Sequence, residues 1–343
     1  MSMLIIATGI SGCGRREHLK TWERFCDRNG KRVKVYHVGE MLFAHAKKTG
    51  IYITQEKVLN TNPDVLMALR SAVFEYILGR LRVDLKENDA VVLNMHTHFY
   101  WKEVISLAYN HSYIKEFNPD MFITFIDSGF AMHKRLNERD QWKDQHLSLK
   151  EVLLWQNMEV VSTKALAETF GKNFFAIAVN QPPETFYNLA FRPEVEPVYA
   201  SMPITHLKSK KDQEKIRNFI KRLNNYFTVF NPLTIEVGPS ILHGEFDGSI
   251  EQNQTIPRDL DWLLGQSNKI IAYFPKVISS PGAIHELREA HDTTKDVWIV
   301  YPEKVASPFL SFFATKIFRS ETAFFRFLEE EYFKKNNNKL TNR

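Results

Sequence analysis

The run Leu4-Ile5-Ile6-Ala7-Thr8 leads directly into Gly9-Ile10-Ser11-Gly12-Cys13-Gly14-Arg15-Arg16. The first run is short and apolar, as expected of a buried strand, and residues 17–29 have the apolar spacing of a helix. A strand, a glycine-rich turn and a helix in this order are the start of a parallel α/β unit. Short apolar runs continue to alternate with helical patterns, so the sequence predicts an α/β protein.

Two such patterns follow one another. The first predicts a helix over 65–81, with Asp64 as its cap after Pro63, another over 148–170, and strands at 4–8, 33–38, 90–94, 121–126 and 174–179. The second predicts a helix over 212–226 and strands at 198–202, 227–230, 269–274 and 297–301. Prolines between 181 and 197 interrupt regular structure between them. We therefore expect two doubly wound parallel-sheet domains, at 1–183 and 195–333, with a loop over 238–257 and a frayed tail over 334–343.

Composition narrows the class of protein. A chain of 343 residues with 44% hydrophobic and 25% charged residues is typical of soluble globular domains. The net charge of +5 is mild, and no basic run indicates nucleic-acid binding, so phosphorylated small molecules are the expected partners. Cys13 and Cys26 are too few for a disulfide framework and fit a reducing cytoplasm. No apolar run could span a membrane, and residues 1–10 lack the features of a signal peptide.

The glycine-rich turn could bind a phosphate through backbone N–H groups and the N-terminus of the next helix. Its glycine spacing is that of a P-loop, but Arg15 stands at the lysine position and Arg16 replaces the hydroxyl residue that would hold Mg²⁺. ATP and Mg²⁺ are possible ligands of this domain. The candidate contacts are Gly9, Ser11, Gly12, Gly14, Arg15 and Arg16. The alternative is a tight turn that binds nothing.

Residues 3–180 resemble archaeal-type adenylate kinases, a group of P-loop nucleotide kinases. The likeness rests on the glycine turn, on 38–47, and on Asn94-Met95-His96-Thr97-His98. These kinases have an acid where Asn94 stands. The resemblance implies that His96 and His98 lie near phosphates and that Arg135 and Arg139 act as lid arginines, although structural histidines and a solvated helix face explain them equally well. It indicates a nucleotide-binding domain with altered catalytic parts.

Two carboxylates flank a strand in the second half. Arg258-Asp259-Leu260-Asp261-Trp262-Leu263 precedes the apolar run 270–274, and Ser280-Pro281-Gly282-Ala283-Ile284-His285-Glu286 follows it. Ligands bind at the carboxyl ends of strands in such sheets. Two acids at one site can divide the cleavage of a glycosidic bond, one meeting the sugar and one the leaving group.

Residues 197–320 are similar to the nucleoside 2-deoxyribosyltransferase superfamily, and within it to the 2′-deoxynucleoside 5′-phosphate N-hydrolases. The likeness rests on 199–205, 258–263, 280–286 and 295–300. It implies a Rossmann-like homodimer that needs no cofactor for the glycosidic step. Glu286 would be the nucleophile, Asp259 would orient it or protonate the departing base, and Tyr199 would hydrogen-bond near the reacting centre. The implied substrate and phosphate contacts are Ser280, Gly282, Ser201, Pro203 and, from the neighbouring subunit, Ser311.

Each of these residues has a purely structural alternative. Asp259 could cap a helix starting near Leu260, Glu286 could be a first-turn helix acid, and Ser280 an ordinary cap. Trp262 is expected in the core. The leading hypothesis is an enzyme that cleaves or exchanges the base–sugar bond of a (deoxy)nucleoside 5′-monophosphate. The alternatives are a nucleoside monophosphate kinase and a nucleotide-gated effector that cleaves nucleotides or NAD⁺.

Overall fold

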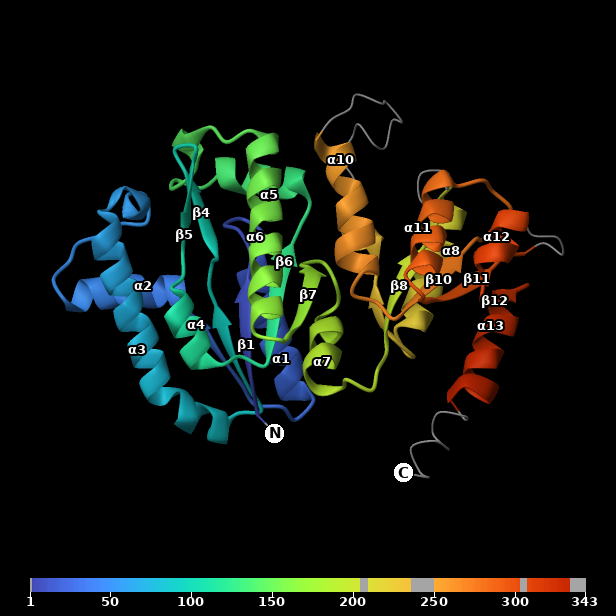
Figure 1. Ribbon diagram of the computed structural model, residues 1–343, viewed down its shortest axis with the longest axis horizontal. Coiled ribbons are helices and arrows are strands. Elements are labelled where there is room, and N and C mark those ends of the chain that lie inside the picture. The colour runs from blue at the N-terminus through green and yellow to red at the C-terminus, as the bar shows by residue number, and fades with distance from the viewer. Residues whose placement is uncertain (1, 204–208, 236–249, 303–306, 334–343) are drawn as a thin grey trace. The chain divides into compact units, whose positions relative to one another are not determined.

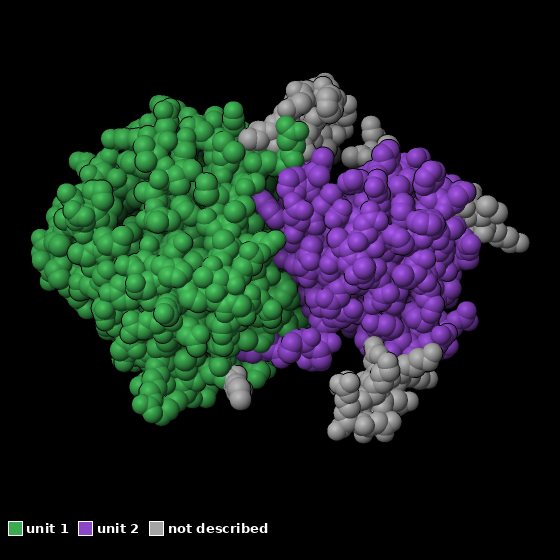
Figure 2. Space-filling view, in the orientation of Figure 1, with its two compact units in different colours: residues 1–190, 234–238, 249–254 green, residues 191–233, 239–248, 255–343 purple. Residues whose placement is uncertain are grey.

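A computed structural model describes residues 2–203, 209–235, 250–302 and 307–333. The chain folds into two compact units, the first made up mainly of residues up to 190 and the second mainly of 191–233 and 255–333 (Figure 2). Each unit is built on a five-stranded, fully parallel sheet flanked by helices (Figure 1). The prediction of an α/β protein with two parallel sheets is therefore confirmed.

The sheet of the first unit has the order β2-β3-β1-β6-β7. Its strands are β1 (Met3–Thr8), β2 (Val33–His37), β3 (Ala90–Asn94), β6 (Met121–Ile126) and β7 (Asn173–Ala178). Counted along the chain, this order is 2-3-1-4-5, and β1 lies at the centre between β3 and β6. The glycine turn follows the central strand, which is where the topology of a doubly wound sheet places its ligand site.

Helices cover both faces of this sheet. They are α1 (Arg15–Arg28), α2 (Val38–Lys48), α3 (Pro63–Glu87), α4 (His111–Phe117), α5 (Gly129–Asn137), α6 (Leu149–Thr169) and α7 (Pro183–Phe191). On one face, side chains of α2, α3 and α4 pack with Leu4 and Ile6 of β1. On the other, Trp22 of α1 stacks on Phe186 of α7, which contacts Phe125 of β6. The turn after β1 is thus held at the rim of a rigid core.

Local sequence explains where the two longest helices begin. Asn62, rather than the expected Asp64, caps α3, because its side chain accepts from the backbone N–H of residues 64 and 65. Ser148 and Glu151 form a reciprocal capping box at the start of α6. The sequence did not predict the antiparallel hairpin of β4 (His98–Trp101) and β5 (Val104–Leu107). Among the described helices, none is both long and apolar enough to cross a membrane.

The second unit has the sheet order β12-β11-β10-β8-β9. The strands are β8 (Pro197–Ser201), β9 (Thr228–Phe230), β10 (Lys269–Tyr273), β11 (Asp296–Val300) and β12 (Lys316–Phe318). Counted within the unit, the order is 2-1-3-4-5, another doubly wound arrangement. The direction of winding reverses between β8 and β10, which pair directly from Lys269 and Val198 onward.

Each face of this sheet has its own helices. They are α8 (Lys210–Leu223), η5 (Arg258–Leu264), α11 (Pro281–Asp292), α12 (Pro308–Phe313), α13 (Glu321–Phe327) and η6 (Leu328–Tyr332). The helix α10 (Ile250–Pro257) is divided between the two units, because its residues up to 254 belong to the first. An aromatic core joins α8 and α13 to one face, where Phe219 stacks on Tyr273 at 4.2 Å between ring centroids. The segments α11 and η5 contact β10 and β8 respectively, and each other. Trp262 is buried, as expected.

Two predictions of irregular structure were wrong. The prolines near 182 do not end regular structure, because Pro183 takes the first position of α7, where its missing N–H costs nothing. Part of the loop expected over 238–257 is instead the helix α10, which runs into η5. The rest of that loop, the patch residues Ile204 and Thr205, and the tail 334–343 lie outside the described residues.

Candidate active site and nucleotide-binding loop

Glu286 belongs to the buried stripe of α11. Ala283, Leu287 and Ala290 are the buried residues of this helix, and they recur with the spacing of its sheet-facing side. Glu286 falls within the same stripe, three residues after Ala283 and four before Ala290. The helix begins at Pro281 and its first turn contains no acid, so the alternative of a first-turn acid is wrong. A carboxylate in an apolar stripe needs partners to compensate for its burial.

Two hydroxyl groups of β8 supply these partners. Tyr199 donates to Glu286 Oε1 at 2.9 Å, and Ser201 donates to Oε2 at 2.5 Å. Side chains two residues apart lie on the same face of a strand, so both hydroxyls point toward α11. Both residues are completely buried. The carboxylate is therefore held at the point where the winding of the sheet reverses, the position where doubly wound sheets bind ligands.

The surroundings of Glu286 change its acidity. Burial, together with the negative charge of Asp259, raises the pKa of Glu286 from 4.5 to about 7. The hydrogen bonds from Ser201 and Tyr199 and the charge of Arg258 act in the opposite direction. Burial and the charge of Glu286 raise the pKa of Tyr199 well above 10, so Tyr199 remains a hydrogen-bond donor. Catalytic acids and bases commonly have a pKa that burial and neighbouring charges shift toward neutrality, as is the case for Glu286.

Asp259 lies in the π-helical segment η5. Its two oxygens form a bidentate ion pair with Arg258, with Nε–Oδ1 2.8 Å and Nη2–Oδ2 3.1 Å. Asp259 is inside a continuous helical segment and caps no helix, so the capping alternative is wrong. Its charge reaches both Glu286 and Tyr199. The hydroxyls of β8 bond the glutamate directly, and the charges of Asp259 and Arg258 act on it. No sequence pattern had indicated this role for Arg258. That Asp259 orients the glutamate or protonates the departing base stays a prediction.

Of the residues that the structure describes, the others predicted to contact the substrate or its phosphate make no hydrogen bond to Glu286. Ser280 caps α11 by accepting from the N–H of Ala283 at 3.3 Å, which confirms the capping alternative. Gly282 is exposed in the first turn of that helix, and Pro203 is buried just beyond β8. Ser311 is exposed on α12. Phosphate contacts of these four residues remain predictions, and His206 lies outside the described part of the chain.

In the first unit, the glycine loop has the backbone conformation that glycine permits. Gly9, Gly12 and Gly14 have φ angles of 149°, 80° and 87°. A Cβ atom on Gly9 would lie 2.9 Å from the carbonyl oxygen of Phe125, and one on Gly14 would lie 2.9 Å from Nη1 of Arg135. The backbone conformation thus disfavours a side chain at all three positions, and at Gly9 the carbonyl oxygen of Phe125 also leaves no space for one. Without side chains in the way, the backbone N–H groups at the start of α1 border the adjoining pocket.

Arg15 is folded beneath the loop. It is 8% exposed, and its Nη1 donates to the carbonyl oxygens of Gly9 at 2.8 Å and Met95 at 2.5 Å. Its Nη2 lies 3.4 Å from Nε2 of His96. Burial and the positive charge of Arg15 hold the pKa of His96 well below its usual range. Arg15 therefore braces the loop, in contrast to a P-loop lysine that reaches toward phosphates.

The side chains at the positions where a P-loop kinase holds Mg²⁺ are engaged with other side chains. Arg16 pairs with Glu40 at 3.0 Å, and the side-chain amide of Asn94 lies 2.7 Å from Nδ1 of His37. Mg²⁺ prefers oxygen ligands in an octahedral set. Among the described residues, no group of three or more His, Cys, Asp or Glu side chains could hold a metal ion.

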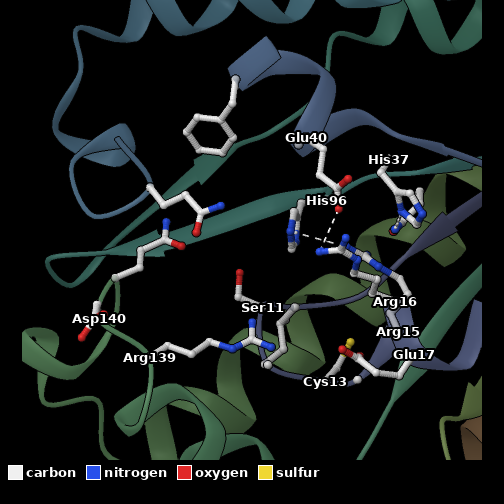
Figure 3. Close-up of a pocket in the computed structure, with 18 of the residues that line it drawn as sticks. Ser11, Cys13, Arg15, Arg16, Glu17, His37, Glu40, His96, Arg139 and Asp140 are labelled. Atoms are coloured by element: carbon white, nitrogen blue, oxygen red, sulfur yellow. Dashed lines mark hydrogen bonds and ion pairs between the residues drawn. The ribbon is translucent and has the colours of Figure 1, made fainter. Parts of the chain in front are cut away.

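Two pockets of the first unit adjoin the glycine loop. One has a volume of about 560 Å³ and is lined by Ser11, Arg16 and the ends of β2 and β3. Figure 3 shows Arg139 approaching Ser11 from one side of this pocket, with His37 and Glu40 on the other. The second, of about 520 Å³, lies beyond Gly14 at the ends of β6 and β7. Gly14 lines both pockets, so the glycine loop lies between them.

Glu159 of α6 is a buried residue that the sequence analysis missed. Its Oε1 accepts from the N–H groups of Gly9 at 3.1 Å and Thr97 at 2.8 Å. Its Oε2 accepts from the hydroxyl of Thr97 at 2.6 Å and the N–H of His98 at 3.0 Å. The carboxylate therefore ties the start of the glycine loop to the segment after β3. Its position in the middle of an apolar helix pattern is the signal that could have indicated this role.

The arginines and histidines discussed above have distinct positions. Arg135 forms an ion pair with Asp127 at the end of β6 and lines the 520 Å³ pocket. Arg139 lines both pockets. His98 is buried, with Nδ1 3.1 Å from the hydroxyl of Thr97. His96 faces the 560 Å³ pocket, so of the two histidines it is the one placed to meet a ligand.

In comparison with known proteins, no family model and no curated protein matches the chain.

Proposed function

We propose that the second unit cleaves, or exchanges, the N-glycosidic bond of a (deoxy)nucleoside 5′-monophosphate, with Glu286 as nucleophile. The observation that carries this proposal is the carboxylate of Glu286 held by Tyr199 and Ser201, at the reversal point of the sheet and within the field of Asp259. The resemblance to the deoxyribosyltransferase superfamily assigns the same glutamate. The geometry supports that assignment independently of the resemblance.

The reaction would use two displacements at one carbon. An oxygen of ionised Glu286 forms a bond to C1′ while the C1′–N bond breaks, and the base departs with the electron pair and takes up a proton. Water, or a second base, then attacks C1′, the bond to Glu286 breaks, and the incoming group loses its proton. The positive charge that develops on the sugar would be stabilised by the carboxylates of Glu286 and Asp259. The hydroxyls of Tyr199 and Ser201 would keep Glu286 oriented through both steps.

The remaining parts of the proposal concern substrate binding. The exposed first turn of α11, with Ser280 and Gly282, would bind the 5′-phosphate through backbone N–H groups. Ser201 and Pro203 would lie beside the sugar. Ser311 would come from the second subunit of a homodimer, for which its exposure on α12 leaves room. We expect the protein to act in the cytoplasm on small-molecule nucleotides.

The test is incubation of the full chain with nucleoside 5′-monophosphates of both sugars and with NAD⁺, followed by chromatographic identification of free base. Glu286→Ala and Glu286→Gln should abolish release. Asp292→Asn, on the exposed last turn of the same helix, is the matched control and should retain it. Base release that persists in both Glu286 variants would remove this residue as nucleophile.

For the first unit, we propose nucleotide binding that gates the second. The pair of pockets flanking the glycine loop favours binding, and the strand order 2-3-1-4-5 is compatible with a kinase-like domain. The positions of Arg15 and Arg16 count against efficient phosphate transfer. A nucleoside monophosphate kinase remains the alternative function of the first unit. In a second form of the gated enzyme, nucleotide binding by the first unit would control cleavage of NAD⁺ in the second.

Gating can be tested by measuring base release with and without ATP. Gly9→Ala should abolish nucleotide affinity and any effect of ATP, because its Cβ would meet the backbone carbonyl oxygen of Phe125. Gly30→Ala is the control, because Gly30 also has a positive φ, of 71°, but open space around its Cβ, and this variant should bind nucleotide like the wild type. Base release that is indifferent to ATP in the wild-type protein would refute gating. Formation of a nucleoside diphosphate from ATP would instead support the kinase.

A further inference from the structure

A third cavity of the first unit opens beside the glycine loop and is apolar. It has a volume of about 130 Å³. Its lining includes Val38, Leu42, Phe43, Leu66, Met95 and Phe99. It shares Ser11, Gly39, Phe43, His96 and Gln141 with the 560 Å³ pocket, so the two pockets are adjacent. One molecule can therefore place a charged end at the loop and a flat apolar end in the cavity.

The size of this cavity indicates what the apolar end can be. An apolar cavity of about 150 Å³ is sufficient for a benzene molecule. The cavity of about 130 Å³ thus matches a single six-membered ring. A fused two-ring system would need the surrounding helices to move apart.

One wall of the cavity carries a buried charge. Arg70 lies on the inward stripe of α3, between Leu66 and Phe74, and is 8% exposed. Its guanidinium carbon is 5.6 Å from the centroid of the Phe99 ring. Within the part of the chain that the structure describes, it has neither a hydrogen bond nor an ion pair. Its N–H donors are therefore available to a ligand that enters the cavity.

We propose that this cavity binds the pyrimidine base of a nucleoside 5′-phosphate, with Arg70 donating to a ring carbonyl oxygen and the phosphate at the glycine loop. Every common pyrimidine base is a single six-membered ring that carries at least one carbonyl oxygen. Adenine has two rings and no carbonyl, and guanine has a carbonyl but two rings. The inference names the ligand class of the first unit and rests on the proposed nucleotide binding there.

The experiment is calorimetric titration of the full chain as its Glu286→Gln variant, so that turnover in the second unit does not consume the ligand. The ligands are CMP, UMP, dTMP, AMP, GMP and ribose 5-phosphate. We expect the pyrimidine nucleotides to bind at least about tenfold more tightly than the purine nucleotides, as hydrogen bonds to a charged donor allow. Because the second unit also binds nucleotides in the proposed function, only the binding that an additional Gly9→Ala substitution removes is assigned to the first unit. Equal or tighter binding of AMP or GMP within that part would overturn the proposal, as would no nucleotide binding that Gly9→Ala removes.

Arg70→Met tests the contact itself, because methionine fills the wall without a donor. It should weaken binding of pyrimidine nucleotides about 10- to 100-fold and leave ribose 5-phosphate unchanged. Arg70→Lys keeps the charge without the planar fork and should lie between. Arg82→Met, an exposed arginine of the same helix, is the control for α3 and should bind normally. An equal loss for ribose 5-phosphate would show that Arg70 binds the phosphate and would refute the base contact.

Two measurements separate this proposal from the glycosidase. If Arg70→Met changes the thermal unfolding temperature, Phe99→Leu provides a second test, since it removes the ring beside the guanidinium but keeps an apolar wall. It should reduce pyrimidine affinity while Arg70 stays in place, and an unchanged affinity would count against the proposal. Base release by the wild-type chain is scored independently, so either proposal can fail while the other stands.

Discussion

Replacing Tyr199 by phenylalanine should make the proposed base release dependent on a higher pH. The substitution removes the hydroxyl that donates to Glu286 Oε1 at 2.9 Å and leaves the buried ring in place. The remaining hydroxyl of Ser201 still donates to Oε2. Because the lost hydrogen bond favours the ionised carboxylate, the pKa of Glu286 must rise above its value of about 7.

The size of the effect follows from this hydrogen bond. A hydrogen bond to a charged group contributes about 1.5–3 kcal/mol, which corresponds to about 1–2 pKa units. At pH 7 about half of Glu286 is ionised in the wild type, and after such a rise about 1–10% would remain ionised. Activity at pH 7 should thus fall about 5- to 50-fold, and at pH 9 it should return to within about twofold of the wild type.

The assay is kcat/KM for base release between pH 5 and 10. Tyr273→Phe is the matched control, because Tyr273 is another buried tyrosine that donates to a glutamate, Glu321, on the opposite face of the same sheet. Its acid limb should coincide with that of the wild type. A loss in Tyr199→Phe that is equal at every pH would show that Tyr199 acts on the transition state, and it would refute control of Glu286 ionisation.

Three other substitutions should give distinct results. Asp259→Asn removes a charge that raises the pKa of Glu286, so the acid limb of base release should move to lower pH; a move upward would contradict the assigned electrostatics. Glu286→Gln should unfold at a higher temperature than the wild type at pH 8 but not at pH 4. The reason is that the pKa of Glu286 is about 7 in the folded state and 4.5 in the unfolded state. The wild-type protein therefore loses up to about 3 kcal/mol of its free energy of unfolding as the pH rises through that range. Calorimetry at the two pH values checks this prediction. Glu159→Gln places its amide N–H₂ against one pair of donors, either the N–H groups of Gly9 and Thr97 or the Thr97 hydroxyl and the N–H of His98. It should cost about 1–3 kcal/mol for each donor left unpaired, and denaturant unfolding unchanged from wild type would argue against the brace.

Most strands of both sheets could be predicted from the sequence. Runs such as 90–94 and 121–126 coincide with β3 and β6, because a strand buried on both faces is a continuous apolar run between turn signals. The sequence did not indicate the hairpin of β4 and β5, because the four residues of β5 do not alternate between apolar and polar. All four of them are exposed, so packing imposes no such alternation. The helix α7 was missed because proline was taken as a breaker where it occupies the first helical position.

The candidate site could be predicted only in part. Glu286, Asp259, Tyr199 and Ser201 were named, but sequence patterns could not show that the two hydroxyls bond the glutamate, because that depends on how β8 is placed beside α11. Arg15 was expected at a phosphate and braces the loop from below, since backbone carbonyls of Gly9 and Met95 converge there only in the fold. Arg70 and Glu159 look like interruptions of apolar helix patterns, and only the packed structure shows what each faces.

The two hydroxyls of β8 must stay on the same face of that strand, which limits how its length can change. Tyr199 and Ser201 occupy odd-numbered positions, while Val198 and Ala200 belong to the core on the opposite face. β8 is paired on both sides, with β9 and β10, so it cannot slide without breaking two ladders. Inserting one residue ahead of Tyr199 would exchange the faces, sending both hydroxyls into the aromatic core and an apolar pair toward the glutamate. Inserting two would restore them, so chain-length changes here should be tolerated only in even steps.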